Sequence, residues 1–229
     1  MRRVYVRRDF EIIGELIEPG TRVLDLGCGE GGLLAWLKDN KSVDARGVEL
    51  SGPRVQKAIA RGVSVYQGDL ESAVEDYPDQ VFDYVILSQT LQETRDPLRV
   101  LRGMLRVGRR GIVAFPNFGH YAVRWATLWS GRAPRTDLFP HDWFDSPNIH
   151  FLTVLDFEAL AAREHWNVER RIFVSGQRQV SMFPNLTAEI AVFLVSAQHP
   201  ASPRTTRGGS TTSRGGVHDP GEGARRPVR

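Results

Sequence analysis

The sequence has little of what several classes of protein require. Cys28 is the only cysteine among the 229 residues, which excludes a disulfide framework and a cysteine-based metal cluster. No run approaches the ~18 consecutive apolar residues of a membrane helix, and the richest stretch is "IAVFLVSA". The N-terminus begins with arginines but lacks an apolar signal core and carries Asp9, Glu11 and Glu15. We therefore expect a cytoplasmic protein without membrane or metal partners.

The positive charge of the chain is concentrated at its C-terminal end. Six arginines against Asp219 and Glu222 give residues 200–229 a charge of +4, which leaves −1 for residues 1–199 of the overall +3. This segment is rich in Arg, Gly and Ser and has almost nothing to bury, which predicts a disordered tail after a single domain at 1–199. Contact with acidic surfaces and a solvated extension both fit this composition, and we expect no specific nucleic-acid partner.

Short apolar runs alternate with helical patterns from Thr21 to about Gln198, which is typical of an α/β fold with a mostly parallel sheet covered by helices on both faces. The expected strands are Arg22–Leu26, Ala45–Leu50, Ser64–Gln67, Phe82–Leu87, Gly111–Phe115, Asn167–Val174 and Glu189–Ala197. The expected helices lie near 31–39, 52–61, 97–106, 120–130 and 155–165. In "DPLRVLRGMLRVG", Asp96 is the expected N-cap and Pro97 the first helical residue.

One long connection, residues 117–153, interrupts the alternation of strands and helices and is called the excursion below. It contains Trp125, Trp129 and Trp143 and several phenylalanines, and it is longer than ordinary connections. Two interpretations remain open: the aromatic residues form a lid or contact surface, or they fill the core beneath a long excursion.

The stretch "VLDLGCGEGG" places Gly27, Gly29 and Gly32 where a strand turns sharply into a helix. The amides at a helix start attract anions, so the glycine spacing alone fits the pyrophosphate of a nicotinamide cofactor. Asp25 disfavours that ligand, because two like charges ~4 Å apart in a partly buried cleft repel by several kcal/mol. S-adenosylmethionine carries an ammonium and a sulfonium, so the same carboxylate favours it.

Further polar residues follow the next strands. Glu49 ends the second strand and can accept both ribose hydroxyls, a feature that nicotinamide sites share. Asp69 ends the third and can accept a hydrogen bond from the adenine amino group, although Glu49 as a surface charge and Asp69 as a helix cap are alternatives. The expected cofactor-binding residues are Asp25, Gly27, Cys28, Gly29, Glu49, Leu50, Asp69, Leu70, Ser88 and Gln89.

On "VLDLGCGEGG", "GVEL" and "GDL" the sequence resembles the class I methyltransferase superfamily. Through "FDYVILSQTLQ", "VLRGMLRVGRRGIVAFPNFGH", "PHDWFDSPNIHF" and "DFEAL" it more closely resembles the methionine biosynthesis protein MetW family, over roughly residues 9–197. The resemblance implies a seven-stranded Rossmann-like methyltransferase fold, S-adenosylmethionine or S-adenosylhomocysteine as ligand, and association with a homoserine O-acyltransferase of the MetX type. Glu93, where the family usually has a small residue, and the tail depart from the pattern.

No catalytic residue is identified. Methyl transfer depends mostly on alignment, and a base is needed only if the acceptor must lose a proton. The candidates in the excursion are His120, His141, His150 and Asp142, with Asn117 and Tyr121 as positioning residues, and a packing role for the histidines is the alternative. Two functions therefore remain: an accessory subunit whose ligand pocket senses an end product, and an active small-molecule methyltransferase.

Overall fold

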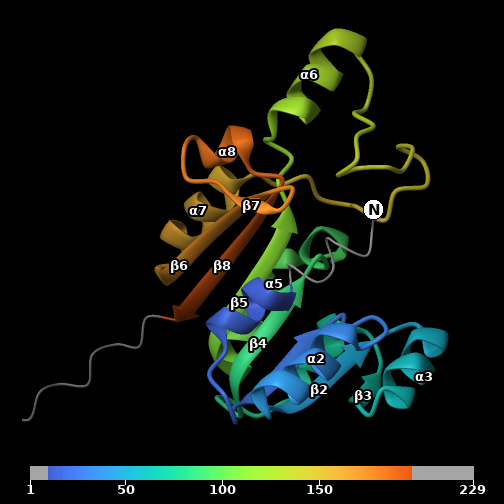
Figure 1. The fold of residues 1–229 in the computed structure, drawn as a ribbon, viewed down its shortest axis with the longest axis vertical. Helices are drawn as coiled ribbons and strands as arrows, with labels where there is room; N and C mark the ends of the chain where they lie inside the picture. Colours follow the sequence, from blue (N-terminus) through green and yellow to red (C-terminus); the bar gives the residue numbers. More distant parts are fainter. Residues whose placement is uncertain (1–9, 198–229) are drawn as a thin grey trace, which may run out of the picture. The chain divides into compact units, whose positions relative to one another are not determined.

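The computed structural model describes residues 10–197, and the sheet is its central feature (Figure 1). The predicted tail at 200–229 lies outside the described residues. The strands are β1 (Arg22–Leu26), β2 (Asp44–Glu49), β3 (Ser64–Gln67), β4 (Phe82–Ser88), β5 (Gly108–Pro116), β6 (Trp166–Ser175), β7 (Arg178–Gln179) and β8 (Ile190–Ala197). They form one sheet in the order β3-β2-β1-β4-β5-β8-β6-β7.

The strand order reverses beside β1, which positions the functional site. β1 pairs in parallel with β2 on one side and with β4 on the other, and β3 and β5 extend the parallel part in both directions. β8 runs antiparallel between β5 and β6. The carboxyl ends of β1, β2, β3 and β4 therefore meet at one edge, where open parallel sheets bind their ligands.

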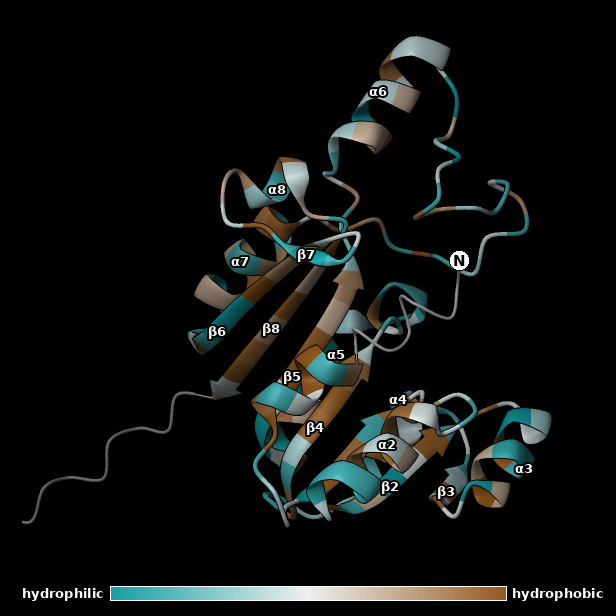
Figure 2. Ribbon diagram, viewed as in Figure 1, coloured by the Kyte–Doolittle hydropathy of each residue, from teal (hydrophilic) through white to brown (hydrophobic). Residues whose placement is uncertain are grey.

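Helices cover both faces of the sheet, as the alternation predicts. They are α2 (Gly32–Lys41), α3 (Gly52–Ala60), α4 (Leu70–Asp76), α5 (Pro97–Val107), α6 (Tyr121–Ser130), α7 (Val154–Arg163) and α8 (Pro184–Thr187), with a 3-10 turn, η1, at Leu91–Glu93. A helical segment at 10–16 and α2 pack in the core on one face, and α4, α5 and α7 pack on the other. Figure 2 shows β4, β5 and β8 as hydrophobic, whereas α3 and α5 mix hydrophobic and hydrophilic residues.

The predicted strands and helices agree closely with the structure, but several elements differ: the helical segment at 10–16, η1 and α8 were not predicted, and β5 begins three residues before the predicted Gly111. The Asp96 side chain caps α5 as predicted, accepting a hydrogen bond from the Arg99 amide at 3.1 Å. Helix α4 was not predicted, because "LESAVED" offers few apolar residues to define a helical face. The predicted second strand extended to Leu50, which lies beyond β2 and is exposed. The two-residue β7 makes eight strands where seven were expected.

The excursion at 117–153 carries its tryptophans on the surface. Trp125 and Trp129 lie on α6, Trp143 lies in the irregular segment that follows, and all three are exposed, Trp129 by 85%. The interpretation that these rings fill the core was therefore wrong. No helix within residues 10–197 combines the length and apolar character needed to cross a membrane.

Candidate functional site

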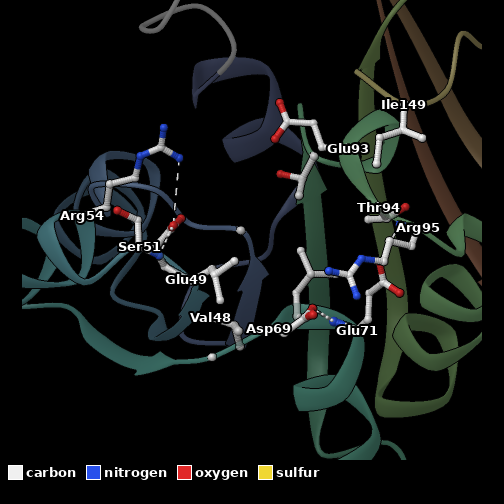
Figure 3. Close-up of a pocket in the computed structure, with 15 residues that line it drawn as sticks. Val48, Glu49, Ser51, Arg54, Asp69, Glu71, Glu93, Thr94, Arg95 and Ile149 are labelled. Atoms are coloured by element: carbon white, nitrogen blue, oxygen red, sulfur yellow. Dashed lines mark hydrogen bonds and ion pairs between the residues drawn. The ribbon is translucent and has the colours of Figure 1, made fainter. Parts of the chain in front are cut away.

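A cavity of about 620 Å³ opens at the carboxyl edge of the parallel strands (Figure 3). Figure 3 shows Glu49 and Arg54 on one side of it and Glu93, Thr94 and Ile149 on the other. Its lining consists of Gly27, Val48, Glu49, Leu50, Ser51, Arg54, Gly68, Asp69, Leu70, Glu71, Thr90, Glu93, Thr94, Arg95 and Ile149.

The glycine turn after β1 is built by backbone geometry. Gly27 and Gly29 both have positive φ, at 82° and 57°, a region that glycine adopts without strain. The amides of Gly27 and Cys28 both donate to the Val48 carbonyl, at 2.8 and 3.0 Å. A Cβ atom at Gly27 would lie 2.7 Å from the Thr90 side chain. The turn is therefore held against β2 on one side and against the segment after β4 on the other.

Glu49 links this turn to the end of β2. One carboxylate oxygen accepts a hydrogen bond from the Gly29 amide at 2.9 Å and the other accepts one from the Ser51 amide at 2.8 Å. The side chain is only 6% exposed, so the alternative of a surface charge was wrong. An ionised carboxylate offers about four acceptor positions, so about two remain beyond these amides, and Arg54 lies 4.0 Å from one of the carboxylate oxygens.

Asp25 lies in β1 directly before the turn and is 4% exposed. Within residues 10–197 its carboxylate accepts no hydrogen bond, and burial, followed by repulsion from Glu49, raises its pKa to about 7. Asp25 is not among the residues that line the cavity. Such a shift means that a nearby positive charge would favour the ionised form of this carboxyl group.

Asp69 performs two tasks at the end of β3. It lines the cavity, and one of its carboxylate oxygens accepts a hydrogen bond from the Glu71 amide at 2.9 Å, which caps α4. The cap role considered from the sequence is thus confirmed. It is compatible with ligand contact because the cap uses only part of the carboxylate's acceptor capacity.

The remaining predicted site residues divide into two groups. Leu50 and Leu70 line the cavity, whereas Cys28, Gly29, Ser88 and Gln89 do not. The Cys28 sulfur faces the backbone of Gly47, where an added Cβ would approach it to 2.4 Å, and burial raises the pKa of this thiol to about 12. Gln89 has a positive φ of 57°, and its buried Nε2 has no hydrogen-bond partner among the described residues.

Several cavity residues gave no signal in the sequence. Ser51 and Arg54 belong to the start of α3, Glu71 to the missed α4, and Thr90, Glu93, Thr94 and Arg95 to the segment after β4. Ile149 arrives from the excursion, whose backbone is fixed there by amides of Ile149 and His150 that donate to the Gln92 carbonyl at 2.8 and 3.0 Å. Nothing local in the sequence predicts that approach.

The lining is negative overall. Glu49, Asp69, Glu71 and Glu93 face Arg54 and Arg95, and the buried Asp25, with a pKa of about 7, adds negative charge to this edge only when it is deprotonated. Burial raises the pKa of Glu93, against smaller lowering effects that include Arg54 and His141. This balance favours a ligand with positive charge over one with a pyrophosphate.

Three of the candidate residues of the excursion make hydrogen bonds or ion pairs within the fold. His120 is buried, caps α6 through Nδ1 at 3.4 Å from the Ala122 amide, and has its pKa lowered by burial. Asn117 is fully buried, and its side chain bonds the Ala188 carbonyl at 2.8 Å and the Gly119 amide at 3.0 Å. Asp142 pairs with Arg135 at 3.2 Å.

Two of the other candidates lie together: His141 and Asp142 line a second cavity of about 460 Å³ with Arg135 and Trp143. His150 lines a separate apolar cavity of about 260 Å³, and Tyr121 is exposed on α6. None of His120, His141, His150 and Asp142 lines the cavity of about 620 Å³. Among residues 10–197 no group of three or more His, Cys, Asp or Glu side chains is placed to hold a metal ion.

Solved structures share this fold at low sequence identity. An S-adenosylmethionine-dependent methyltransferase from Archaeoglobus fulgidus matches with a TM-score of 0.63 at 13% identity, covering 84% of this chain and 93% of that one. Another from Mesorhizobium loti matches with a TM-score of 0.61 at 18% identity, covering 82% and 97%. The fold is that of the class I S-adenosylmethionine-dependent methyltransferases.

The sequence comparisons are more specific. The model of the family "Methionine biosynthesis protein MetW" matches residues 7–195. The bifunctional methionine biosynthesis protein MetXA/MetW of Rhodopirellula baltica is 36% identical over 197 residues, which cover 80% of this chain and 32% of that protein. Phosphoethanolamine N-methyltransferase 3 of Arabidopsis thaliana is 30% identical over 90 residues, 38% of this chain and 18% of that protein.

The chain therefore belongs to the methionine biosynthesis protein MetW family, with a methyltransferase-like fold. It spans about a third or less of the length of these two curated relatives.

Proposed function

We propose that the cavity binds S-adenosylmethionine or S-adenosylhomocysteine, and that the chain acts in the cytoplasm as an accessory subunit of a homoserine O-acyltransferase of the MetX type. One observation carries the first part. Glu49 ends β2, Asp69 follows the adjacent parallel strand β3 by two residues, and both line the same cavity, beside the glycine turn.

The hydrogen-bond acceptors and apolar side chains of the cavity fit this ligand. The free acceptor positions of Glu49 suit the two ribose hydroxyls, and those of Asp69 suit the adenine amino group. Leu50 and Leu70 supply apolar surface for the adenine ring. Asp25, beneath the turn, supplies negative charge toward the cationic end of the ligand. When bound, S-adenosylmethionine supplies an activated methyl group or, for an accessory subunit, a signal of the pathway's product level.

The accessory role rests on the family and on the bifunctional relative, in which a MetXA part and a MetW part share one polypeptide. A route for coupling exists between the cavity and the excursion. Ile149 lines the cavity, and its amide is bonded to the carbonyl of Gln92 next to Glu93. Ligand occupancy biases the complex if its two states differ in affinity for the ligand.

Copurification with the homoserine O-acyltransferase of the same organism tests this role. Acyl transfer is then assayed with the acyltransferase alone, with this chain added, and with S-adenosylmethionine present. We expect a complex, higher acyl transfer with the chain, and a change in that rate on adding the ligand. An acyltransferase that neither binds the chain nor responds to it refutes the accessory role.

The alternative is an active methyltransferase of a small-molecule acceptor. The intact carboxylates of the cavity favour it, as does the partial likeness to phosphoethanolamine N-methyltransferase 3, which is confined to 38% of this chain. Because methyl transfer is mostly a matter of alignment, the dispersed histidines do not oppose it. Transfer of a labelled methyl group to a metabolite in a cell extract, abolished by Asp25→Ala, establishes this function; no labelled product at all opposes it.

A further inference from the structure

Helix α6 is held to the domain at its first turn only. Val123 is its one buried residue, and the bonds around Asn117 and the Arg124 side chain, which donates to the Gly119 carbonyl at 2.6 Å, fix its start. The rest of the helix extends away from the sheet (Figure 1). A ten-residue helix is only marginally stable in water when nothing packs against it.

One face of this helix is apolar and exposed. Tyr121, Trp125, Leu128 and Trp129, hereafter the α6 ridge, are 52%, 59%, 77% and 85% exposed. Their spacing of i, i+4, i+7 and i+8 aligns them on one side of the helix. This is the pattern with which a helix inserts its side chains into an apolar groove of a partner protein.

The segment that contains the α6 ridge is rich in exposed hydrophobic side chains. Eight of the fifteen exposed large hydrophobic residues lie between 121 and 151. They are Tyr121, Trp125, Leu128, Trp129, Trp143, Phe144, Ile149 and Phe151. The tyrosine and the two tryptophans of the α6 ridge expose on the order of 450 Å² between them, which is more than half of the ~800 Å² per partner of a standard interface.

The charge pattern identifies the kind of partner. Helices that lie on lipid surfaces carry several Lys or Arg on their polar face. α6 has a single cation, Arg124, and its guanidinium is bonded to Gly119. The α6 ridge therefore fits a protein groove better than an anionic membrane.

We propose that the α6 ridge is the docking surface for the acyltransferase, inserted as a helix into an apolar groove of that enzyme. The inference rests on the proposed accessory function. It commits to the acyltransferase because the bifunctional relative places one MetXA part beside one MetW part in the same polypeptide, a one-to-one arrangement.

The test measures acyltransferase affinity by titration calorimetry for the full chain, Trp125→Ala, Trp129→Ala and a control, Ile59→Ala. Ile59 is 56% exposed on α3, at the other end of the molecule from α6 (Figure 1). We expect each tryptophan variant to weaken binding by about tenfold or more, because aromatic anchors concentrate interface energy. We expect Ile59→Ala to change it by less than about twofold, and all variants to keep wild-type circular dichroism.

The outcomes separate this inference from the proposed function. A wild-type chain that does not bind the acyltransferase refutes the accessory function itself. Wild-type binding that both tryptophan variants retain refutes only the docking surface. If the variants instead alter self-association in sedimentation, or lose pelleting with phosphatidylcholine–phosphatidylglycerol vesicles while acyltransferase binding is unchanged, the surface belongs to a second copy or to a membrane, and the inference is wrong.

Discussion

The carboxylate of Glu49 accepts a hydrogen bond from the backbone amide of Gly29 at 2.9 Å. This bond joins the end of β2 to the turn that follows β1, so the two parts of the cavity that carry the acid and the glycines are positioned together. A substitution in either part is therefore expected to shift the other, so the glycine turn is the first place to test how the cavity is built.

Gly27→Ala is expected to lower the free energy of unfolding by about 2–4 kcal/mol, because it adds a side chain at positive φ and a contact of 2.7 Å with Thr90. Thr90 cannot easily give way, since its hydroxyl donates to the Ser88 carbonyl at 2.9 Å. The matched control is Gly20→Ala, also at positive φ but with nothing within 4 Å of the added Cβ. We expect that variant to lose only about 1 kcal/mol. Equal losses in urea unfolding would show that Thr90 does not confine the turn.

Ligand binding should depend on pH through Asp25. Its pKa of about 7 in the free protein means that a cationic ligand must displace a proton at or below neutral pH. The affinity for S-adenosylmethionine is expected to be full above about pH 8 and to fall by up to about tenfold per pH unit below about pH 7. Calorimetric titration across this range measures it, with Asp25→Asn expected to lose both the affinity and its pH dependence. If the affinity of the wild-type chain does not change with pH, the positive charge of the ligand does not lie near Asp25.

Raising the pH is expected to strengthen ligand binding through Asp25 but to lower the free energy of unfolding of the ligand-free protein. Folding raises the pKa of Asp25 from 3.8 to about 7, so the folded state binds more protons in that window and stability falls as the pH rises through it. Without ligand, Asp25→Asn is expected to raise the free energy of unfolding above about pH 7 by on the order of 1–4 kcal/mol, and to have little effect near about pH 4. Urea unfolding at the two pH values checks this; a variant less stable than wild type above neutral pH contradicts it.

Asp69 allows its cap role and its ligand role to be separated. Asparagine caps helices about as well as aspartate, so Asp69→Asn should leave the free energy of unfolding within about 0.5 kcal/mol of wild type. It should still weaken S-adenosylmethionine binding, because a neutral amide is a poorer acceptor for the adenine amino group. Asp69→Ala should lose both the cap, by about 1 kcal/mol, and the affinity. Unchanged affinity in both variants would assign Asp69 to the helix alone.

Most of the strands and helices could be predicted from the sequence, because runs of apolar residues and capping residues determine them locally. Apolar runs identify the strands, and the Asp96 cap is encoded within four residues. The spacing of the glycines predicts the turn, and the parallel order of the strands predicts that the acids after them meet at one edge of the sheet. Cavity residues such as Arg54 and Ile149 could not be predicted, since their place depends on how distant segments pack. The exposure of Trp125 and Trp129 was equally undetermined, because large aromatic residues suit both cores and interfaces.

The central claim is that the cavity accepts a nucleoside ligand that carries an ammonium group and no pyrophosphate, and that Glu49 holds it. Titration calorimetry with S-adenosylmethionine, S-adenosylhomocysteine and NAD, on the wild-type chain, Glu49→Gln and Glu75→Gln, tests it most directly. Glu75 is a matched acid that pairs with Arg99 at the surface, outside the cavity. We expect the two sulfur-containing ligands, but not NAD, to bind wild type and Glu75→Gln, and Glu49→Gln to bind at least about thirtyfold more weakly. Tight binding of NAD without binding of S-adenosylmethionine would contradict the account.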